Sequence, residues 1–255
     1  YLLKNKYVEF AQKSFAVALI FVTLASLAQP LIGHQHAHVV RDYQPGKLAA
    51  FEGLYESTEN APLYVFGYTN PETKKTYGIA IPGMLSLLTW GELNHEVAGL
   101  DKIPPEEWPN VGLVFQTYHG MVAIGMFLIG LTLFSLFLLW RNKLFEQKWL
   151  MKVFVISVIL PVLANQLGWI SAEVGRQPWI VQGLLKTSEA VSPSVSGGMV
   201  LSSLIMFLIM YGLLFWVWVY VLDKEIKHGP AEFFKEGEGS SVYRKRENKV
   251  FLGKK

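Results

Sequence analysis

The chain has 255 residues, of which 51% are apolar, and a net charge of +3 from 23 basic and 20 acidic side chains. It contains no cysteine, which excludes disulfides and thiolate-ligated iron or zinc, and its small net charge gives no reason to expect a nucleic-acid partner. Four apolar stretches are each long enough to cross a hydrocarbon layer of about 30 Å as a helix. The sequence therefore predicts an all-α integral membrane protein with four transmembrane helices, at residues 14–32, 111–140, 150–172 and 198–222.

Basic side chains flank these stretches unevenly. Lysines and arginines precede the first stretch, fill the short connection between the second and third, and follow the fourth. Because basic residues are retained on the cytoplasmic side, both termini are expected there, and the 33–110 and 177–197 segments outside. The predicted organisation is a lead-in with the first helix at 1–32, a long extracytoplasmic loop at 33–110, three helices at 111–222 and a cytoplasmic tail at 223–255.

The loop opens with three alternating histidines, His34, His36 and His38. In an extended chain they would share one face, which permits a metal site. A solvated surface loop is the simpler expectation for so short a motif.

Residues 46–53 read Gly-Lys-Leu-Ala-Ala-Phe-Glu-Gly. A short helix here would place Lys47 and Glu52 about a turn and a half apart. Taken alone, this is most simply a solvated amphipathic turn. The rest of the loop is rich in turn-forming and aromatic residues, and loops of such length with little regular structure commonly carry function.

The 111–140 helix contains Gln-Thr-Tyr-His-Gly-Met at 116–121 in its outer half. The thioether of Met121 can ligate haem iron, although most intramembrane methionines only fill space. The imidazole of His119 is the commoner kind of haem ligand. Two residues turn a helix by about 200°, so His119 and Met121 cannot both bind one iron from this helix.

The 150–172 helix leads into Gly-Trp-Ile-Ser-Ala-Glu-Val-Gly-Arg-Gln-Pro-Trp at 168–179. On a helix Trp169, Glu173 and Arg176 share one face, and ionisable groups at such depth usually mark a functional site. The simpler interpretation is an i,i+3 ion pair between Glu173 and Arg176 at the membrane boundary.

The 198–222 helix contains no charged side chain and ends in aromatic residues, Phe215, Trp216, Trp218 and Tyr220. Aromatic belts of this kind lie at membrane interfaces. A span that faces lipid or another subunit is expected.

Two of these segments resemble signatures of subunit I of the cytochrome bd quinol oxidases. Ala-Glu-Val-Gly-Arg-Gln-Pro-Trp at 172–179 is similar to the family's haem-binding motif, and Lys-Leu-Ala-Ala-Phe-Glu at 47–52 is similar to the start of its quinol-binding loop. The resemblance extends over residues 1 to about 230, in the order of the family's C-terminal half. The N-terminal half, with the remaining haem ligands, is expected on another chain or on a stretch outside this sequence.

The resemblance implies a role for each candidate residue. Glu173 would be the axial ligand of a high-spin b haem, and Met121 would ligate a low-spin b haem. Lys47 and Glu52 would serve quinol oxidation, in which the carboxylate accepts a proton while the lysine polarises an oxygen. The chain departs from the family at His119, where an arginine is expected two residues before the methionine, so His119 stays open as the alternative ligand.

The implied function is the C-terminal portion of a terminal quinol:oxygen oxidoreductase, which is not active as this chain alone. Electrons would pass from quinol to the haem at Met121, then to the haem at Glu173, and finally to an oxygen-reducing haem d or third b haem held elsewhere. Arg176 would offset negative charge there, and Trp169 would assist electron transfer or only anchor the packing. The implied partners are the N-terminal half of subunit I, subunit II, small accessory subunits, membrane lipid and quinol, in the plasma membrane of a prokaryote.

Two other functions stay open. One is a haem-free quinone-binding or transporter subunit, in which Glu173 and Arg176 form a proton relay or a structural pair. The other is a relative within the superfamily that retains only electron transfer or a scaffold role. The departure from the family's pattern at His119 keeps this alternative open.

Overall fold

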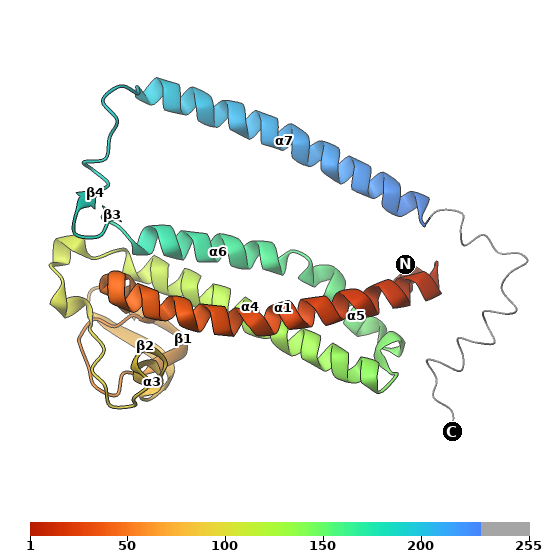
Figure 1. Ribbon diagram of the computed structural model, residues 1–255, viewed down its shortest axis with the longest axis horizontal. Coiled ribbons are helices and arrows are strands. Elements are labelled where there is room, and N and C mark those ends of the chain that lie inside the picture. The colour runs from red at the N-terminus through yellow and green to blue at the C-terminus, as the bar shows by residue number, and fades with distance from the viewer. Residues whose placement is uncertain (231–255) are drawn as a thin grey trace, which may run out of the picture. The chain divides into compact units, whose positions relative to one another are not determined.

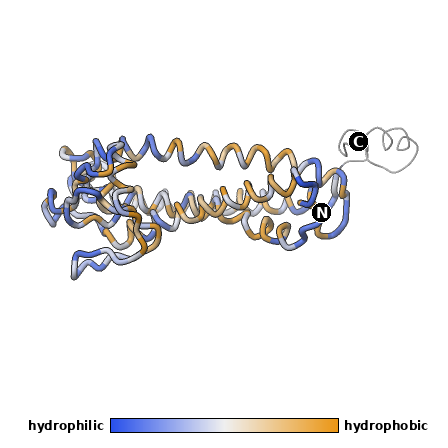
Figure 2. The backbone as a smooth tube through the Cα atoms, turned by 90° about the horizontal axis from the view of Figure 1, so that it is seen from below, coloured by the Kyte–Doolittle hydropathy of each residue, from blue (hydrophilic) through white to orange (hydrophobic). Residues whose placement is uncertain are grey.

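The computed structural model describes residues 1–230 of the chain. Within that range four helical spans are long and apolar enough to cross a membrane, and they are the longest ribbons of Figure 1. Figure 2 shows apolar residues along the middle of these helices and hydrophilic residues towards their ends. The spans are α1 (Val8–Tyr43), α4 (Val111–Trp140), the α5–α6 pair (Lys148–Gly175) and α7 (Gly197–His228). The prediction of an all-α membrane protein with four transmembrane helices is therefore confirmed.

The third span is interrupted. It consists of α5 (Lys148–Ser157) and α6 (Leu160–Gly175), with a break between them. Pro161 lies in the first turn of α6, where a missing N–H costs nothing because first-turn amides have no helical partner. Proline cannot donate to a carbonyl of the preceding turn, so the regular hydrogen bonding of α5 ends before it.

Helix α1 extends beyond the predicted 14–32 span at both ends, and its outer turns contain the three histidines. This segment is therefore helical and is neither extended nor a loop. His34 and His38 meet edge to face with ring centroids 4.6 Å apart, while the helical repeat turns His36 away from them. Residues 1–230 contain no group of three or more histidine and acidic side chains that could hold a metal ion.

The segment between α1 and α4, expected to have little regular structure, is folded. It contains helix α2 (Pro45–Glu52), an antiparallel hairpin of β1 (Leu63–Asn70) and β2 (Lys75–Ile81), helix α3 (Met84–Trp90) and the short 3-10 helices η2 (Leu100–Lys102) and η3 (Pro105–Glu107). Phe66, Tyr68 and Tyr77 are exposed on the hairpin. The strands thus lack the clean alternation of buried apolar and exposed polar residues by which a sequence reveals a strand.

Two clusters of buried side chains hold this part of the chain together. One joins the folded segment to the first turns of α4, and its buried members are Val40, Leu48, Ala49, Ala50, Leu54, Tyr55, Ala61, Leu85, Val97, Leu100, Val111 and Val114. The other lies near the opposite end of α4, beside the 3-10 helices η1 (Leu2–Lys4) and η4 (Leu144–Glu146), and comprises Leu19, Leu131, Leu144, Leu150 and Met151. Burial of these side chains supplies most of the packing outside the lipid-facing surfaces.

A small hairpin of β3 (Trp179–Val181) and β4 (Leu185–Lys186) follows α6. Lys186 pairs with Glu107 at 3.2 Å, which ties this hairpin to the folded segment. From Ser192 onward the chain forms a second compact unit, whose described part is the apolar helix α7. The predicted tail starts inside α7, and its residues 231–255 lie outside the described part of the chain.

Candidate functional site

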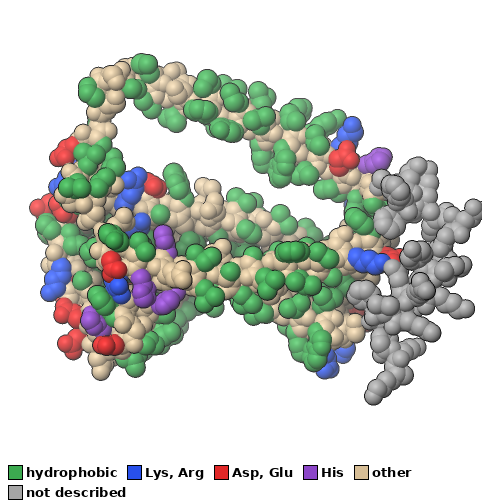
Figure 3. All heavy atoms as spheres, in the orientation of Figure 1, with side chains coloured by type: hydrophobic (Ala, Val, Ile, Leu, Met, Phe, Trp, Pro, Cys, Tyr) green, Lys and Arg blue, Asp and Glu red, His purple; other side chains and the backbone are tan. Residues whose placement is uncertain are grey.

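Helix α2 carries the candidate residues Lys47 and Glu52 and belongs to the end of the bundle where charged and histidine side chains gather (Figure 3). Pro45 lies in its first turn, and Gly53 ends it with a φ of 63°, a left-handed conformation that favours glycine. A Cβ on Gly53 would also lie 2.5 Å from Oγ1 of Thr76 in β2. The hairpin therefore packs directly on the end of α2 and fixes its position.

Glu52 is an almost fully buried acid. It is 3% exposed, and its Oε2 has no hydrogen-bond partner among the described residues. Burial raises the pKa of the Glu52 carboxyl to about 8, and a hydrogen bond from the Tyr118 hydroxyl opposes part of this rise. Such a carboxyl can take up and release a proton close to neutral pH.

Lys47 lies between α2 and the end of α6. Its Nζ is 5.8 Å from the centre of the Phe51 ring, and a Cβ on Gly175 would come within 3.1 Å of its Cγ. Burial lowers the pKa of Lys47, while the charge of Glu173 opposes this shift and that of Arg176 adds to it. The structure therefore brings the two sequence signatures together across the α2–α6 interface.

Glu173 and Arg176 form an ion pair with the expected i,i+3 spacing. Nε of Arg176 donates to Oε2 of Glu173 at 2.9 Å, and a second guanidinium nitrogen contacts the same oxygen. The Glu173 side chain is 40% exposed, and Trp169, one turn earlier, is 63% exposed. The arginine thus holds the carboxylate in place on an exposed face of α6.

Met121 packs from α4 against α6. A Cβ on Gly168 would lie 2.6 Å from its Sδ, so a larger residue at 168 would displace the sulfur. At the neighbouring position, a Cβ on Gly120 would meet Leu167 at 3.2 Å. Close approach of two helices at glycine positions is typical of membrane proteins.

His119 faces a different element from Met121, as the helical repeat predicts. Its Nδ1 lies 2.9 Å from the carbonyl oxygen of Phe115, and its Nε2 lies 2.9 Å from that of Tyr64 in β1. The imidazole also stacks on the Phe115 ring with centroids 3.9 Å apart. Both ring nitrogens are engaged by backbone carbonyls, and neither is open to a metal in this arrangement.

Two of the candidate ligands offer atoms and surroundings that fit haem iron. The Met121 thioether is a known kind of axial ligand, and its sulfur lies against Gly168 of α6, where there is no room for a larger side chain. The Glu173 carboxylate is positioned by Arg176 on an exposed face, where the Trp169 ring offers a flat apolar surface to a macrocycle.

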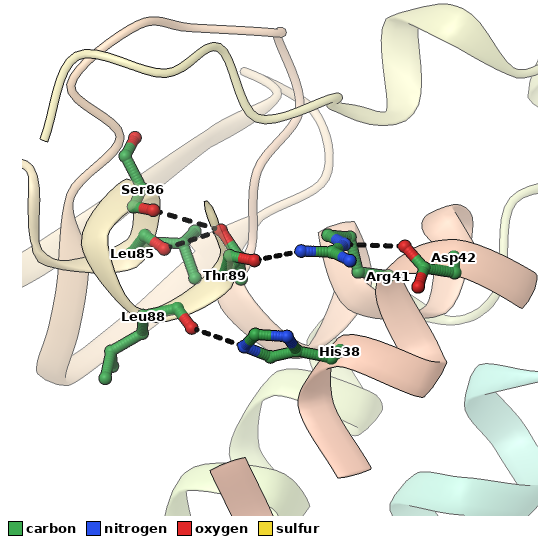
Figure 4. Close-up of polar contacts among 7 residues, drawn as sticks. All are labelled: His38, Arg41, Asp42, Leu85, Ser86, Leu88 and Thr89. Atoms are coloured by element: carbon green, nitrogen blue, oxygen red, sulfur yellow. Dashed lines mark hydrogen bonds and ion pairs between the residues drawn. The ribbon is translucent and has the colours of Figure 1, made fainter. Parts of the chain in front are cut away.

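The histidine-containing end of α1 contacts helix α3 through His38 and Arg41, as Figure 4 shows. Nε2 of His38 lies 3.2 Å from the carbonyl oxygen of Leu88, and the Arg41 guanidinium donates to that of Thr89. Cζ of Arg41 also lies 4.1 Å from the centre of the Trp90 ring. Because the last carbonyls of a helix have no partner within it, these contacts cap α3 and anchor it to α1.

Two features of the site were missed by the sequence analysis. Tyr118 stacks in parallel on Phe51, and its hydroxyl reaches Glu52, but nothing in the local sequence marks this contact because its partners lie far away along the chain. Gly168 and Gly175 are seven residues apart and so lie on one face of α6. That spacing of small residues is a signal of close helix packing that could have been found in the sequence.

The chain is similar to known membrane oxidases. Cytochrome bd ubiquinol oxidase subunit 1 of Bacillus subtilis (strain 168) is 36% identical over 239 residues, which cover 89% of this chain and 51% of that protein. The putative cytochrome bd menaquinol oxidase subunit I of the same strain is 36% identical over 234 residues, covering 90% and 51%. The solved structure of bd oxidase from Geobacillus thermodenitrificans matches with a TM-score of 0.76 and 30% identity, over 89% of this chain and 52% of that one.

The chain spans about half the length of the curated relatives it matches. A family model described as cytochrome bd terminal oxidase subunit I matches residues 1–230, which is the whole of the described range. The four membrane-crossing helices and the two sequence signatures agree with that match. On this evidence the chain belongs to the family of cytochrome bd terminal oxidase subunit I.

Proposed function

We propose that this chain is the C-terminal portion of subunit I of a cytochrome bd-type quinol:oxygen oxidoreductase, and that it oxidises membrane quinol at α2. The observation that carries the proposal is α2 itself, a short helix that bears a buried acid, Glu52, and a half-buried lysine, Lys47. This helix packs against α4 and α6, the two helices that bear the predicted haem ligands. The ubiquinol and menaquinol named for the relatives support a quinol substrate.

Acid–base chemistry in this reaction falls to Glu52 and Lys47. A quinol that is oxidised loses two protons and two electrons, and the ionised Glu52 carboxylate accepts a proton from a quinol hydroxyl. With a pKa of about 8, the protonated carboxyl releases that proton again in the working pH range. The Lys47 ammonium donates a hydrogen bond to a quinol oxygen and stabilises the negative charge left by the departing proton.

Met121 and Glu173 are the residues proposed to hold the low-spin and the high-spin b-type haem, which supply one-electron acceptors when bound. Met121 is favoured over His119 because both imidazole nitrogens of His119 already contact carbonyl oxygens. Arg176 is ion-paired with Glu173 and orients its carboxylate, and Trp169 lies one turn away on the same open face. The ligands of the oxygen-reducing haem, d or b, belong to the rest of the complex.

The partners and the orientation follow from the same proposal. The N-terminal half of subunit I, subunit II and small accessory subunits complete the enzyme in a bacterial plasma membrane. With basic residues inside, both termini are cytoplasmic and the folded 33–110 segment is outside. Protons from quinol are then released on the outer side.

The test separates quinol chemistry from haem content. In the purified complex, Glu52→Gln and Lys47→Met are expected to slow haem reduction by a short-chain quinol by about 100-fold or more, while dithionite reduces the haems to the wild-type extent. Glu59→Gln and Lys75→Met change exposed residues of the same segment and should leave both reductions unchanged. A complex without haem bands, or wild-type quinol reduction in Glu52→Gln, would contradict the proposal.

A further inference from the structure

Tyr118 extends from α4 to the acid of the proposed quinol site. Its ring lies parallel to that of Phe51, with centroids 4.5 Å apart and an angle of 4° between the planes. The neighbouring His119 ring meets it edge to face at 5.4 Å. These contacts restrict the ring, so the hydroxyl that hydrogen-bonds to Glu52 has a defined position.

Within residues 1–230, a hydrogen bond from the Tyr118 hydroxyl lowers the pKa of the Glu52 carboxyl, which burial raises, and Oε2 of that carboxyl has no partner of its own. The charged and titratable groups named next lie on elements packed against α2 and contact groups other than the Glu52 carboxyl. On α1, Arg41 pairs with Asp42, and on η2, Asp101 accepts a hydrogen bond from Ser57 while Lys102 pairs with Glu96. On α4, His119 contacts two carbonyl oxygens. On α6, the charges of Glu173 and Arg176 shift the pKa of Lys47 in opposite directions.

Resting on the proposed function, we infer that Tyr118 is the positioning residue for proton acceptance: its hydroxyl orients the Glu52 carboxyl, whose buried and unpartnered Oε2 takes up the proton of a quinol hydroxyl. In that step the O–H bond of the quinol breaks and a new O–H bond forms at Oε2, while Tyr118 keeps its own proton. A hydrogen bond to a carboxylate also favours its charged form, which opposes the effect of burial on the pKa of Glu52. The contact therefore increases the fraction of ionised acceptor at neutral pH.

The place of Tyr118 on α4 adds a second consequence. It precedes Met121 by three residues, which is about 4.5 Å along the helix axis. One rigid helix therefore positions the proton acceptor and also bears the residue proposed to hold the electron acceptor. Such an arrangement keeps the two acceptors at a constant separation while quinol gives up a proton and an electron.

The substitution Tyr118→Phe tests this, because it keeps the ring stacked on Phe51 and removes only the hydroxyl. In the purified complex, haem content, reduction by dithionite and the KM for quinol should be unchanged. Quinol-driven turnover at pH 7 should fall about tenfold, and the rising limb of its pH profile should move up by about one unit, because the pKa of Glu52 rises further. Tyr68→Phe removes an exposed hydroxyl on the hairpin and should leave the profile unmoved.

A double variant shows whether Tyr118 acts through Glu52. In a Glu52→Gln background, Tyr118→Phe should cause no further loss of turnover. An additional loss there, an unshifted pH profile or a loss of haem would overturn the inference. If Glu52→Gln abolishes quinol oxidation but Tyr118→Phe leaves the pH profile of turnover unshifted, only this inference is overturned. If Glu52→Gln retains wild-type turnover, the proposed function is overturned as well.

Discussion

Glu52 and Glu173 are the same kind of side chain in opposite surroundings. Glu52 is 3% exposed and has no cation paired with it in the described structure, so its carboxyl holds a proton up to about pH 8. Glu173 is 40% exposed at its side chain and forms an ion pair with Arg176. The environment, and not the residue type, thus separates a buried acid with a raised pKa from an exposed acid that is held by an arginine.

The surroundings of Glu52 and Glu173 meet at the interface between α2 and α6. Lys47 lies on the helix that bears Glu52, and its pKa responds to the charges of Glu173 and Arg176 across the α2–α6 interface. Gly175 permits that contact, because a Cβ there would meet Lys47, Val114 and Phe51 within 3.5 Å. A change at Glu173 can therefore affect the surroundings of Glu52 through packing at Gly175 and through the charge that acts on Lys47.

The largest effect is expected from Glu173→Ala. Removal of the carboxylate deletes the proposed ligand and leaves Arg176 without its partner, so the high-spin b haem should be lost completely while quinol binding persists. A reduced-minus-oxidised spectrum measures the loss, with the exposed Glu189→Ala as the control. Unchanged haem bands would show that Glu173 and Arg176 form only a structural ion pair.

A similar all-or-none result is expected on α4. Met121→Leu should remove the low-spin haem band, because it replaces the thioether by a side chain of similar volume without a donor. His119→Leu should keep that band and instead lower stability by about 1–3 kcal/mol, because the imidazole contacts with the carbonyl oxygens of Phe115 and Tyr64 are lost. The opposite pattern of band loss would establish His119 as the ligand.

The pH dependence of quinol oxidation should follow Glu52 and not Glu173. Because an acceptor must be ionised, the rate should rise by up to about tenfold per pH unit below pH 8 and level off above it. Reduction by dithionite, measured on the same samples, should show no such rise. A quinol-driven rate that stays flat between pH 6 and pH 9 would remove Glu52 from the role of acceptor.

The smallest effect is expected at the contact between the two acids. Gly175→Ala would place a Cβ 3.1 Å from Cγ of Lys47 and should destabilise the complex by about 1–3 kcal/mol, with a few-fold loss of quinol turnover. Gly130→Ala is the matched control, since no atom lies within 4 Å of the added Cβ, and it should be neutral or slightly stabilising. Equal thermal unfolding midpoints for the two variants would show that the α2–α6 contact is not tight.

Local composition was enough to predict several features of this protein. Apolar length set the four membrane-crossing helices, and two short signatures led to the family that the comparisons confirm. Such features need no knowledge of distant contacts, because a bilayer requires about 20 apolar residues in a row wherever they occur. The helical state of His34 to His38 was not predicted, because it depends on a distant contact. His38, in the outer turns of α1, contacts the carbonyl oxygen of Leu88 in α3.

The assembly of the site, in contrast, depends on contacts that form when the chain folds. The burial of Glu52, the Tyr118 hydroxyl beside it and the engagement of both His119 nitrogens each need segments that are far apart along the chain. Burial and hydrogen bonding depend on what surrounds a group in space, and no local pattern records those neighbours. The candidate side chains could therefore be predicted from the sequence. Which of them are buried, ion-paired or exposed depends on the packing of α2 against α4 and α6.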